Sequence, residues 1–472
     1  MAAAARWPNK AGPFEAHSDC LKVRPQTLVL CMPSTKSVAL FVVACALGGV
    51  MIATTINRLT VPPNTAVQAK APSLDDLYRA CVDGGWPTGV DARRRSEACS
   101  QALQTRHLRL DQIALARLSR GVARTILGNE VTSAEDYLEA LKHYDNVIDP
   151  HNPDALDVYR RAVAEQGLGE TDKALADYST AIRLNPKNQL AYLGRGTLLA
   201  TRERSYLRAI DDFNRTLQIE PVNVTALTAR GDAWSQLGEF GPALADLNRV
   251  IDLSPTNARA LVVRGLVRAR QGNALLALQD YDAALKIVPR EPFALSNRAA
   301  IYAQQGKYGL AIRDLDAAIE IDSRNVLAFY NRGYAQFSLG HYAEAIADYD
   351  AALRLDGKMG LAYLNRCLTR VVAGAAKADD LADCDVALKL MPLNLEVRET
   401  RGFIFLKLGE PAKALTEYSA VLAIDANRPL ALYGRGVAQC RLGKSQEGEK
   451  DKAAAVAVSP SIGRQFARFG VS

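Results

Sequence analysis

From about residue 155 the chain repeats itself roughly every 34 residues, and no other feature of the sequence constrains the fold as strongly. Four prolines mark this period in succession, at Pro186, Pro221, Pro255 and Pro289, which are 35, 34 and 34 residues apart. The same place in later periods is taken by Ser323, Gly357, Pro392, Ala426 and Pro460. A fixed period of this length is typical of stacked supersecondary units, each of which buries its apolar face only against its neighbours.

Small side chains recur at two places in each period, and an aromatic residue follows the second place by four positions. The first set is Gly196, Gly231, Gly265, Ala299, Gly333, Gly402 and Gly436. The second set is Ala174, Ala209, Ala243, Ala277, Ala311, Ala345 and Ala414, followed by Tyr178, Phe213, Tyr281, Tyr349 and Tyr418. Two antiparallel helices pack closely where small side chains let their backbones approach and aromatic rings fill the gaps beside them. Glycines at 169, 238, 272, 306 and 340 are expected to end the first helix of each pair.

The repeated segments resemble tetratricopeptide repeats, most closely FYNRGYAQFSLGHYAEAIADYDAALRLDG at 329–357 and YLNRCLTRVVAGAAKADDLADCDVALKLMP at 363–392. The resemblance implies an all-α, right-handed superhelical solenoid of helix-turn-helix repeats with a concave binding groove. We assign nine repeats to residues 153–460 and degenerate repeats to 74–152. In the closing segment 461–472, Ile462, Phe466 and Phe469 share one helical face, which predicts a helix that caps the last repeat.

An arginine precedes the first small residue of nearly every period, and an acidic residue precedes the aromatic position. The arginines are Arg120, Arg161, Arg195, Arg230, Arg264, Arg298, Arg332, Arg366, Arg401 and Arg435. The acids are Asp177, Asp212, Asp246, Asp280, Asp314, Asp348, Asp383, Glu417 and Asp451. A basic stripe for an anionic ligand is one interpretation. Because the charges match almost one for one, we favour a ladder of internal ion pairs that joins the helices and fixes their register.

Residues 37–57 contain no charged side chain and are long enough to cross a bilayer core as one helix. Basic residues are more numerous before this segment than just after it, which favours an orientation with the N-terminus inside. We therefore expect a basic tail at 1–36, a transmembrane signal anchor at 37–57 and a linker at 58–73. Two alternatives stay open: a start at Met32 with a cleaved signal peptide, and a lipoprotein, since the four residues ending at Cys45 resemble a bacterial lipobox.

The cysteines fall into two matched pairs. Cys81 and Cys99 flank the first degenerate repeat, whereas Cys367 takes the small-residue position and Cys384 the aromatic position of one later repeat. Because those positions face each other in an antiparallel helix pair, we expect two disulfides, formed in an oxidising compartment. Four separate buried thiols are the alternative, and Cys440 is left as a free thiol. This paired decoration, with the closing QFARFGV, resembles exported membrane-anchored repeat proteins of alphaproteobacteria.

The sequence carries no motif for catalysis or for metal binding. Its five histidines are scattered without an HExxH pattern, and Walker and G-x-S-x-G motifs are absent. Residues 1–70 hold seven basic and two acidic side chains of a chain whose net charge is +7, so the remainder is nearly neutral. It lacks the basic stripe of a nucleic-acid-binding protein. We expect no enzyme activity, no cofactor, no metal, no nucleic acid and no small-molecule substrate.

The resemblance to tetratricopeptide repeats also implies which first-helix residues face the groove. The candidates are Arg259, Phe293, Tyr330, Tyr334, Phe337, Phe403 and Tyr433. Some members of the family bind a C-terminal carboxylate through Lys and Asn, but here those places hold mostly Leu, Tyr, Phe, Ser and Thr. An aromatic groove could instead receive an extended peptide or an amphipathic helix. The alternative is that some of these rings only pack between neighbouring helices.

These observations predict a non-catalytic scaffold for protein–protein interaction. We expect it to be a single-pass protein of the bacterial inner membrane, with its repeats on the periplasmic side. A cytosolic co-chaperone-like adaptor and an accessory factor to a cell-envelope enzyme complex are the two alternatives.

Overall fold

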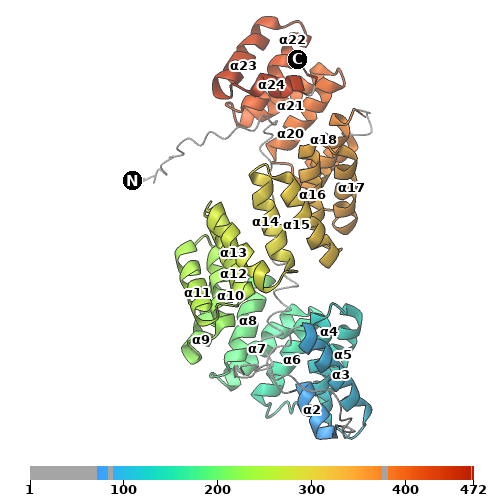
Figure 1. Ribbon diagram of the computed structural model, residues 1–472, viewed down its shortest axis with the longest axis vertical. Helices are drawn as coiled ribbons and strands as arrows, with labels where there is room; N and C mark the ends of the chain where they lie inside the picture. Colours follow the sequence, from blue (N-terminus) through green and yellow to red (C-terminus); the bar gives the residue numbers. More distant parts are fainter. Residues whose placement is uncertain (1–71, 83–88, 375–380, 469, 472) are drawn as a thin grey trace, which may run out of the picture. The chain divides into compact units, whose positions relative to one another are not determined.

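The computed structural model describes residues 72–82, 89–374, 381–468 and 470–471. These residues form 23 α-helices, α2 to α24, and contain no strand (Figure 1). The helices belong to two compact units, which meet in the sequence between Pro289 and Arg290. We call them the first unit and the second unit, and each is described by itself.

The first unit consists of six helix pairs in its described part. Their bounds are α2 (Leu74–Val82) and α3 (Gly89–Gln104), α4 (Leu110–Ile126) and α5 (Glu130–Val147), α6 (Ala155–Leu168) and α7 (Thr171–Leu184), α8 (Gln189–Thr201) and α9 (Tyr206–Ile219), α10 (Val224–Gln236) and α11 (Phe240–Leu253), and α12 (Ala258–Arg270) and α13 (Ala274–Ile287). We call each pair a hairpin, with a first helix and a second helix.

The second unit consists of five hairpins and a short closing helix. Their bounds are α14 (Pro292–Gln304) and α15 (Tyr308–Ile321), α16 (Val326–Leu339) and α17 (Tyr342–Leu355), α18 (Gly360–Val372) and α19 (Leu381–Leu390), α20 (Leu395–Lys407) and α21 (Pro411–Ile424), α22 (Pro429–Arg441) and α23 (Ser445–Val458), and α24 (Ile462–Arg468). The all-α solenoid of helix pairs that the 34-residue period predicts is confirmed.

Local sequence signals begin and end the first helices. Asn257 and Asn325 are N-caps whose side-chain oxygens accept hydrogen bonds from the backbone N–H of Ala260 and Ala328, each at 3.0 Å. At the other end, Gly340 has φ 84°, a left-handed conformation that glycine adopts at little cost. The predicted glycine ends are confirmed, while the asparagine caps were not part of the sequence prediction.

The small residues lie where the two helices of a hairpin come closest. A Cβ placed on Gly265 would lie 2.6 Å from the ring of Tyr281, and one placed on Gly333 would lie 2.9 Å from the ring of Tyr349. Both tyrosines are completely buried. The predicted pairing of small residues with aromatic rings is therefore confirmed, and it builds the core of each hairpin.

The predicted transmembrane helix at 37–57 lies outside the described residues, as do the basic tail at 1–36 and the linker at 58–73. Among the helices that the structure does describe, none combines the length and the apolar character needed to cross a bilayer.

The closing helix α24 packs on α22 and α23, and its Phe466 reaches further, to α20. The ring of Phe466 lies 4.9 Å from that of Tyr433 and 5.8 Å from that of Phe403, measured between centroids. A helix that only capped the last hairpin would not reach α20, so α24 covers part of the first helices as well. Ile462 and Phe466 are buried, as predicted for one apolar face, and Phe469 lies outside the described residues.

Candidate functional site

From α4 onward, the arginine of each first helix pairs with the acid of its own second helix. Ten such ion pairs, with N–O distances of 2.6–3.1 Å, run from Arg120–Asp136 in α4 and α5 to Arg435–Asp451 in α22 and α23. Most are bidentate: Arg332 donates from Nε to Asp348 Oδ2 at 2.9 Å and from Nη2 to Oδ1 at 2.6 Å. The predicted internal ladder is confirmed, and its arginines are occupied by protein acids.

The same arginines also reach back to the preceding hairpin, which the sequence analysis did not predict. Arg332 donates from Nη1 to Asp316 at 2.7 Å, and Arg366 donates in the same way to Asp350 at 2.6 Å. In the first unit Arg230 donates to the amide oxygen of Asn214 at 2.6 Å. One guanidinium therefore joins three helices, fixing both the hairpin and its stacking on the hairpin before it.

In the hairpin of α6 and α7, a second acid lies near the Arg161–Asp177 ion pair of the ladder. In three hairpins a second arginine, four residues after the first, also contacts the ladder acid: Arg124, Arg268 and Arg370. In α6 that position is Glu165, which is 7% exposed and whose Oε2 has no hydrogen-bond partner among the described residues. Burial, and then the neighbouring Asp177, raise the pKa of Glu165 to about 7.

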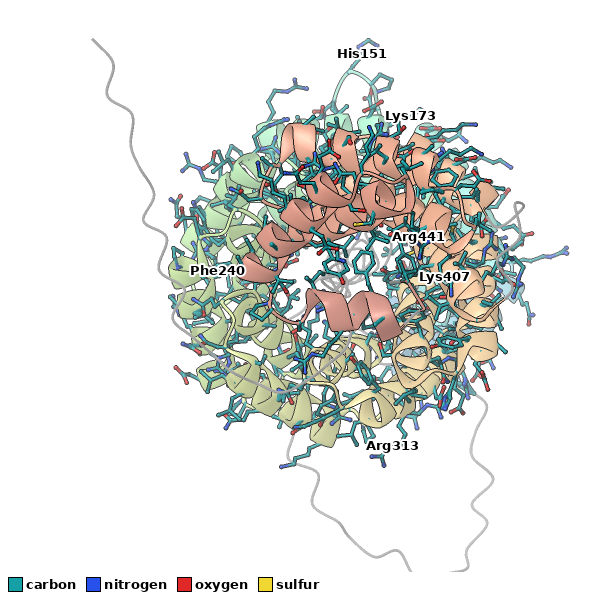
Figure 2. The ribbon with its side chains drawn as sticks, turned by 90° about the horizontal axis from the view of Figure 1, so that it is seen from above. His151, Lys173, Phe240, Arg313, Lys407 and Arg441 are labelled. Atoms are coloured by element: carbon teal, nitrogen blue, oxygen red, sulfur yellow. A yellow bond between two sulfur atoms is a disulfide. The ribbon has the colours of Figure 1, made fainter. Side chains whose placement is uncertain are left out.

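The first helices of the second unit each turn a corresponding face to the same side, and we call these faces together the inner face. It is the side on which Lys407 and Arg441 lie. Figure 2 shows Lys407 of α20 and Arg441 of α22 pointing to the inner side of the curve, while Arg313 of a second helix points to the outer side. Residues four or eight positions apart on a helix share a face, so Phe403 and Tyr433 belong to the inner face as well. The equivalent repeat positions to Phe403 are Leu368 in α18 and Tyr334 in α16.

The predicted groove residues differ in how much surface they offer. Tyr330 is only 1% exposed: its ring lies 6.0 Å from that of Tyr349, and its hydroxyl accepts a hydrogen bond from Asn365 at 3.0 Å. Phe403 is 5% exposed beneath Phe466. For these two, packing between neighbouring elements describes the structure better than an open groove.

Four of the partly exposed aromatic residues of the second unit form two ring pairs, and we call them the aromatic cluster: Tyr308, Tyr334, Phe337 and Tyr342. The rings of Tyr308 and Tyr334 lie 6.4 Å apart edge to face, and those of Phe337 and Tyr342 lie 5.8 Å apart. Such contacts hold rings rigidly while leaving their outer faces available. Leu327, seven residues before Tyr334 on α16, is also half-buried on this side.

The other groove candidates lie at different places. Arg259 lies in the first turn of α12 in the first unit, Phe293 lies in the first turn of α14 in the second, and both are half-buried. Tyr433 is half-buried against α24. In the first unit the first helices are more polar, and the guanidinium of Arg270 donates to the carbonyl and hydroxyl oxygens of Ser235, both at 3.1 Å. Burial lowers the pKa of Arg270.

Both cysteine pairs bridge the helices that the sequence analysis named. Cys81 of α2 and Cys99 of α3 have sulfur atoms 2.14 Å apart, and Cys367 of α18 and Cys384 of α19 have sulfur atoms 2.25 Å apart. All four side chains are buried. Cys440 is a half-buried thiol whose sulfur lies 3.7 Å from a carboxylate oxygen of Glu449.

Within residues 72–82, 89–374, 381–468 and 470–471, no three His, Cys, Asp or Glu side chains come together in a way that could hold a metal ion. The acids whose pKa is raised, Glu165 apart, are Asp212 and Asp348 of the ladder and Glu399 of the buried Glu399–Arg428 pair, and each of the three has an arginine partner.

Comparison with known proteins identifies the repeats. Family models described as tetratricopeptide repeats match residues 159–224, 197–268, 299–340 and 326–359. The chain therefore contains tetratricopeptide repeats. Such repeats imply a scaffold for protein–protein interaction, and proteins built from them are generally non-catalytic.

Individual relatives share only a part of their length with this chain. Sperm-associated antigen 1 of Rattus norvegicus is 34% identical over 116 residues, which are 25% of this chain and 13% of the rat protein. Small glutamine-rich tetratricopeptide repeat-containing protein 2 of Mycosarcoma maydis is 34% identical over 100 residues, 20% of this chain and 27% of that protein. The crystal structure of the APC/C hetero-tetramer Cut9–Hcn1 superposes with a TM-score of 0.48 at 14% identity, covering 81% of this chain and 90% of that one.

Proposed function

We propose that this chain, which contains tetratricopeptide repeats, binds an apolar peptide or helix of a partner protein on the aromatic cluster, which α16 and the first residues of α15 and α17 supply, and on the inner face of α18. The observation that carries the proposal is the aromatic cluster, whose rings are held by one another and remain partly exposed. Rigid aromatic side chains supply contact area at little cost in conformational entropy, which is why they dominate binding surfaces.

The side chains around this surface favour a neutral, apolar partner segment over an anionic one. The ladder arginines already have carboxylate partners, so they are not available as a stripe for phosphate or for acidic peptides. Leu327 and Leu368 extend the apolar side of α16 and α18 beyond the rings. An extended peptide or an amphipathic helix with aliphatic anchors fits such a surface.

Site-specific photo-crosslinking tests this proposal. A photoreactive amino acid at Leu327 or at Leu368 should crosslink the same partner in cells, whereas one at Arg313, on the outer side, should not. Adding Phe337→Ala should reduce the yield from Leu327 about tenfold, as expected for the loss of one central aromatic contact. Equal crosslinking from Arg313, or a yield that Phe337→Ala leaves unchanged, would contradict the assigned surface.

We further propose that residues 37–57 anchor the chain in the bacterial inner membrane with the repeats on the periplasmic side. The charge-free stretch, the basic residues before it and the two cysteine pairs support this arrangement. Alkylation of intact cells before and after reduction, followed by mass spectrometry, tests it. Protection of Cys81, Cys99, Cys367 and Cys384 before reduction supports export, while four reactive thiols would favour a cytosolic adaptor.

The same crosslinking experiment distinguishes a general scaffold from the remaining alternative, an accessory factor to a cell-envelope enzyme complex. If the partner captured from Leu327 is an enzyme of the cell envelope, the chain is an accessory factor to that enzyme complex. A partner without catalytic activity would leave the general scaffold role.

A further inference from the structure

The closing helix α24 makes its main contacts with the inner-face side of the last two hairpins. Its Phe466 is completely buried between Phe403 and Tyr433, and its Ile462 is 3% exposed. Gly463 passes against the ring of Tyr433, because a Cβ placed on it would lie 3.0 Å from the Tyr433 hydroxyl oxygen. The segment thus covers two residues that the repeat pattern assigns to the groove.

The residues after α24 continue along the same side. Gly470 and Val471 end the helix with hydrogen bonds from their N–H groups to the carbonyls of Ala467 and Phe466, at 2.9 and 3.1 Å. This is a Schellman turn, and Val471 is completely buried. A Cβ on Gly470 would lie 3.6 Å from Nζ of Lys407, which Figure 2 shows on the inner side.

The segment has the form of a ligand. Ile462 and Phe466 are four residues apart and enter the site from one side of a two-turn helix, while Arg464 between them is exposed. This i, i+4 arrangement of apolar anchors is how amphipathic helices bind grooves. Leu368 of α18 packs against the same apolar cluster. The site under α24 is therefore continuous with the inner face of the preceding hairpin, formed by α18 and α19.

We propose that the inner face of α20 and α22 is a binding site for an amphipathic helix with an aliphatic and an aromatic residue four positions apart, and that the chain's own residues 461–471 occupy it in the absence of a partner. This inference rests on the proposed function, since it names the partner chemistry of that same inner face. A partner helix of this kind binds by displacing α24.

The closing segment is suited to be displaced. Three apolar side chains, those of Ile462, Phe466 and Val471, supply its burial, and about a dozen residues must be ordered to bring them there. So few buried apolar side chains place the segment among the less firmly held parts of the chain. A partner helix with the same anchors competes with it for the site, and the tether raises the partner concentration that is needed.

A peptide-binding experiment on the chain itself tests the proposal. The probe is a fluorescent synthetic peptide of residues 461–472, and the receptors are the full chain in mild detergent and the same chain ending at Pro460. The truncated chain should bind the peptide at least tenfold more tightly than the full chain does. Phe466→Ala in the peptide, or Phe403→Ala in the truncated chain, should abolish most of this binding, while Arg464→Ala in the peptide should leave it unchanged.

Each other outcome overturns the inference. A truncated chain that stays helical by circular dichroism but binds no peptide shows that the site needs its covalent tether. A truncated chain that loses its helical signal shows that α24 is only a structural part of the last hairpins. Because crosslinking from Leu327 uses α16 in the full chain, the broader proposal can stand where this one fails, and the reverse.

Discussion

Among single residues, Glu165 is the side chain whose protonation should control stability. The pKa of Glu165 is raised from an ordinary value near 4.5 to about 7 in the folded chain. At low pH this carboxyl is protonated in both states and does not lower the free energy of unfolding. As pH rises through about 7 the folded chain must hold the buried charge, and the stability present at low pH is lost. Glu165→Gln should therefore raise the free energy of unfolding by about 2 kcal/mol at pH 8 and change it little at pH 4. Urea denaturation at both pH values measures the difference.

The control for this substitution is Glu344→Gln, at an exposed position of α17. It should leave the denaturation midpoint unchanged at both pH values. An equal effect of Glu165→Gln at pH 4 and pH 8 would contradict a role for the charge.

Gly265 and Gly241 offer a second residue-scale test, because both are helical glycines in the first unit. A methyl group on Gly265 would lie 2.6 Å from the buried ring of Tyr281, whereas one on Gly241 would meet nothing within 4 Å. Gly265→Ala should destabilise the chain by about 1–3 kcal/mol through overpacking. Gly241→Ala should be neutral or stabilising by up to about 1 kcal/mol, because alanine favours helix. Thermal melts of the two variants provide the comparison, and a similar loss in both would contradict the close-approach explanation.

The 34-residue period predicted which residues pair with each other better than it predicted which residues are exposed. The ladder partners follow from matched charges one period after another, and nine of them were named from sequence. Tyr330 and Tyr334 are both aromatic and both lie on the same side of α16, yet only Tyr334 stays partly exposed. The difference arises because α18 brings Asn365 over the hydroxyl of Tyr330. Contacts between hairpins of this kind are not encoded in the pattern of one helix.

At the scale of helices, the ladder stabilises each hairpin to a degree that depends on how many arginines contact its acid. Asp348 has Arg332 as its partner from α16, whereas Asp280 has both Arg264 and Arg268 from α12, each at 2.7 Å. Arg332→Ala should cost about 3–5 kcal/mol, because it leaves a buried carboxylate without that partner. Arg264→Ala should cost clearly less, since Arg268 still neutralises Asp280.

Chemical denaturation of the two variants tests this ordering. The double variant Arg332→Leu with Asp348→Leu should recover much of the stability lost in Arg332→Ala, because a buried ion pair adds little beyond what apolar side chains would provide. A double variant that is less stable than Arg332→Ala would show that the pair has a large net stabilising effect.

For the whole molecule, the same repeat builds two units, and each has apolar clusters of its own. The first unit has clusters around Tyr137 and Tyr178, around Phe213 and around Leu247, and the second has clusters around Tyr349, Cys367 and Tyr418. Nothing in the 34-residue period marks the boundary at Pro289, because the proline there occupies its ordinary place in the register. The division into units therefore could not be predicted from the repeat pattern alone.

Because each unit has apolar clusters of its own, we predict that each unit folds by itself. A fragment of residues 290–472 should show the helical circular dichroism of five hairpins and a cooperative unfolding transition, since repeat stability is a sum of hairpin and nearest-neighbour terms. A matched fragment of residues 306–472 removes α14 and with it Arg298, so Asp314 loses the 2.7 Å ion pair that joins α15 to α14. It should unfold at a lower denaturant concentration than the longer fragment, because α15 loses the helix that it packs on together with the ion pair that joins the two helices. Two fragments of equal stability would show that α14 does not stabilise the second unit.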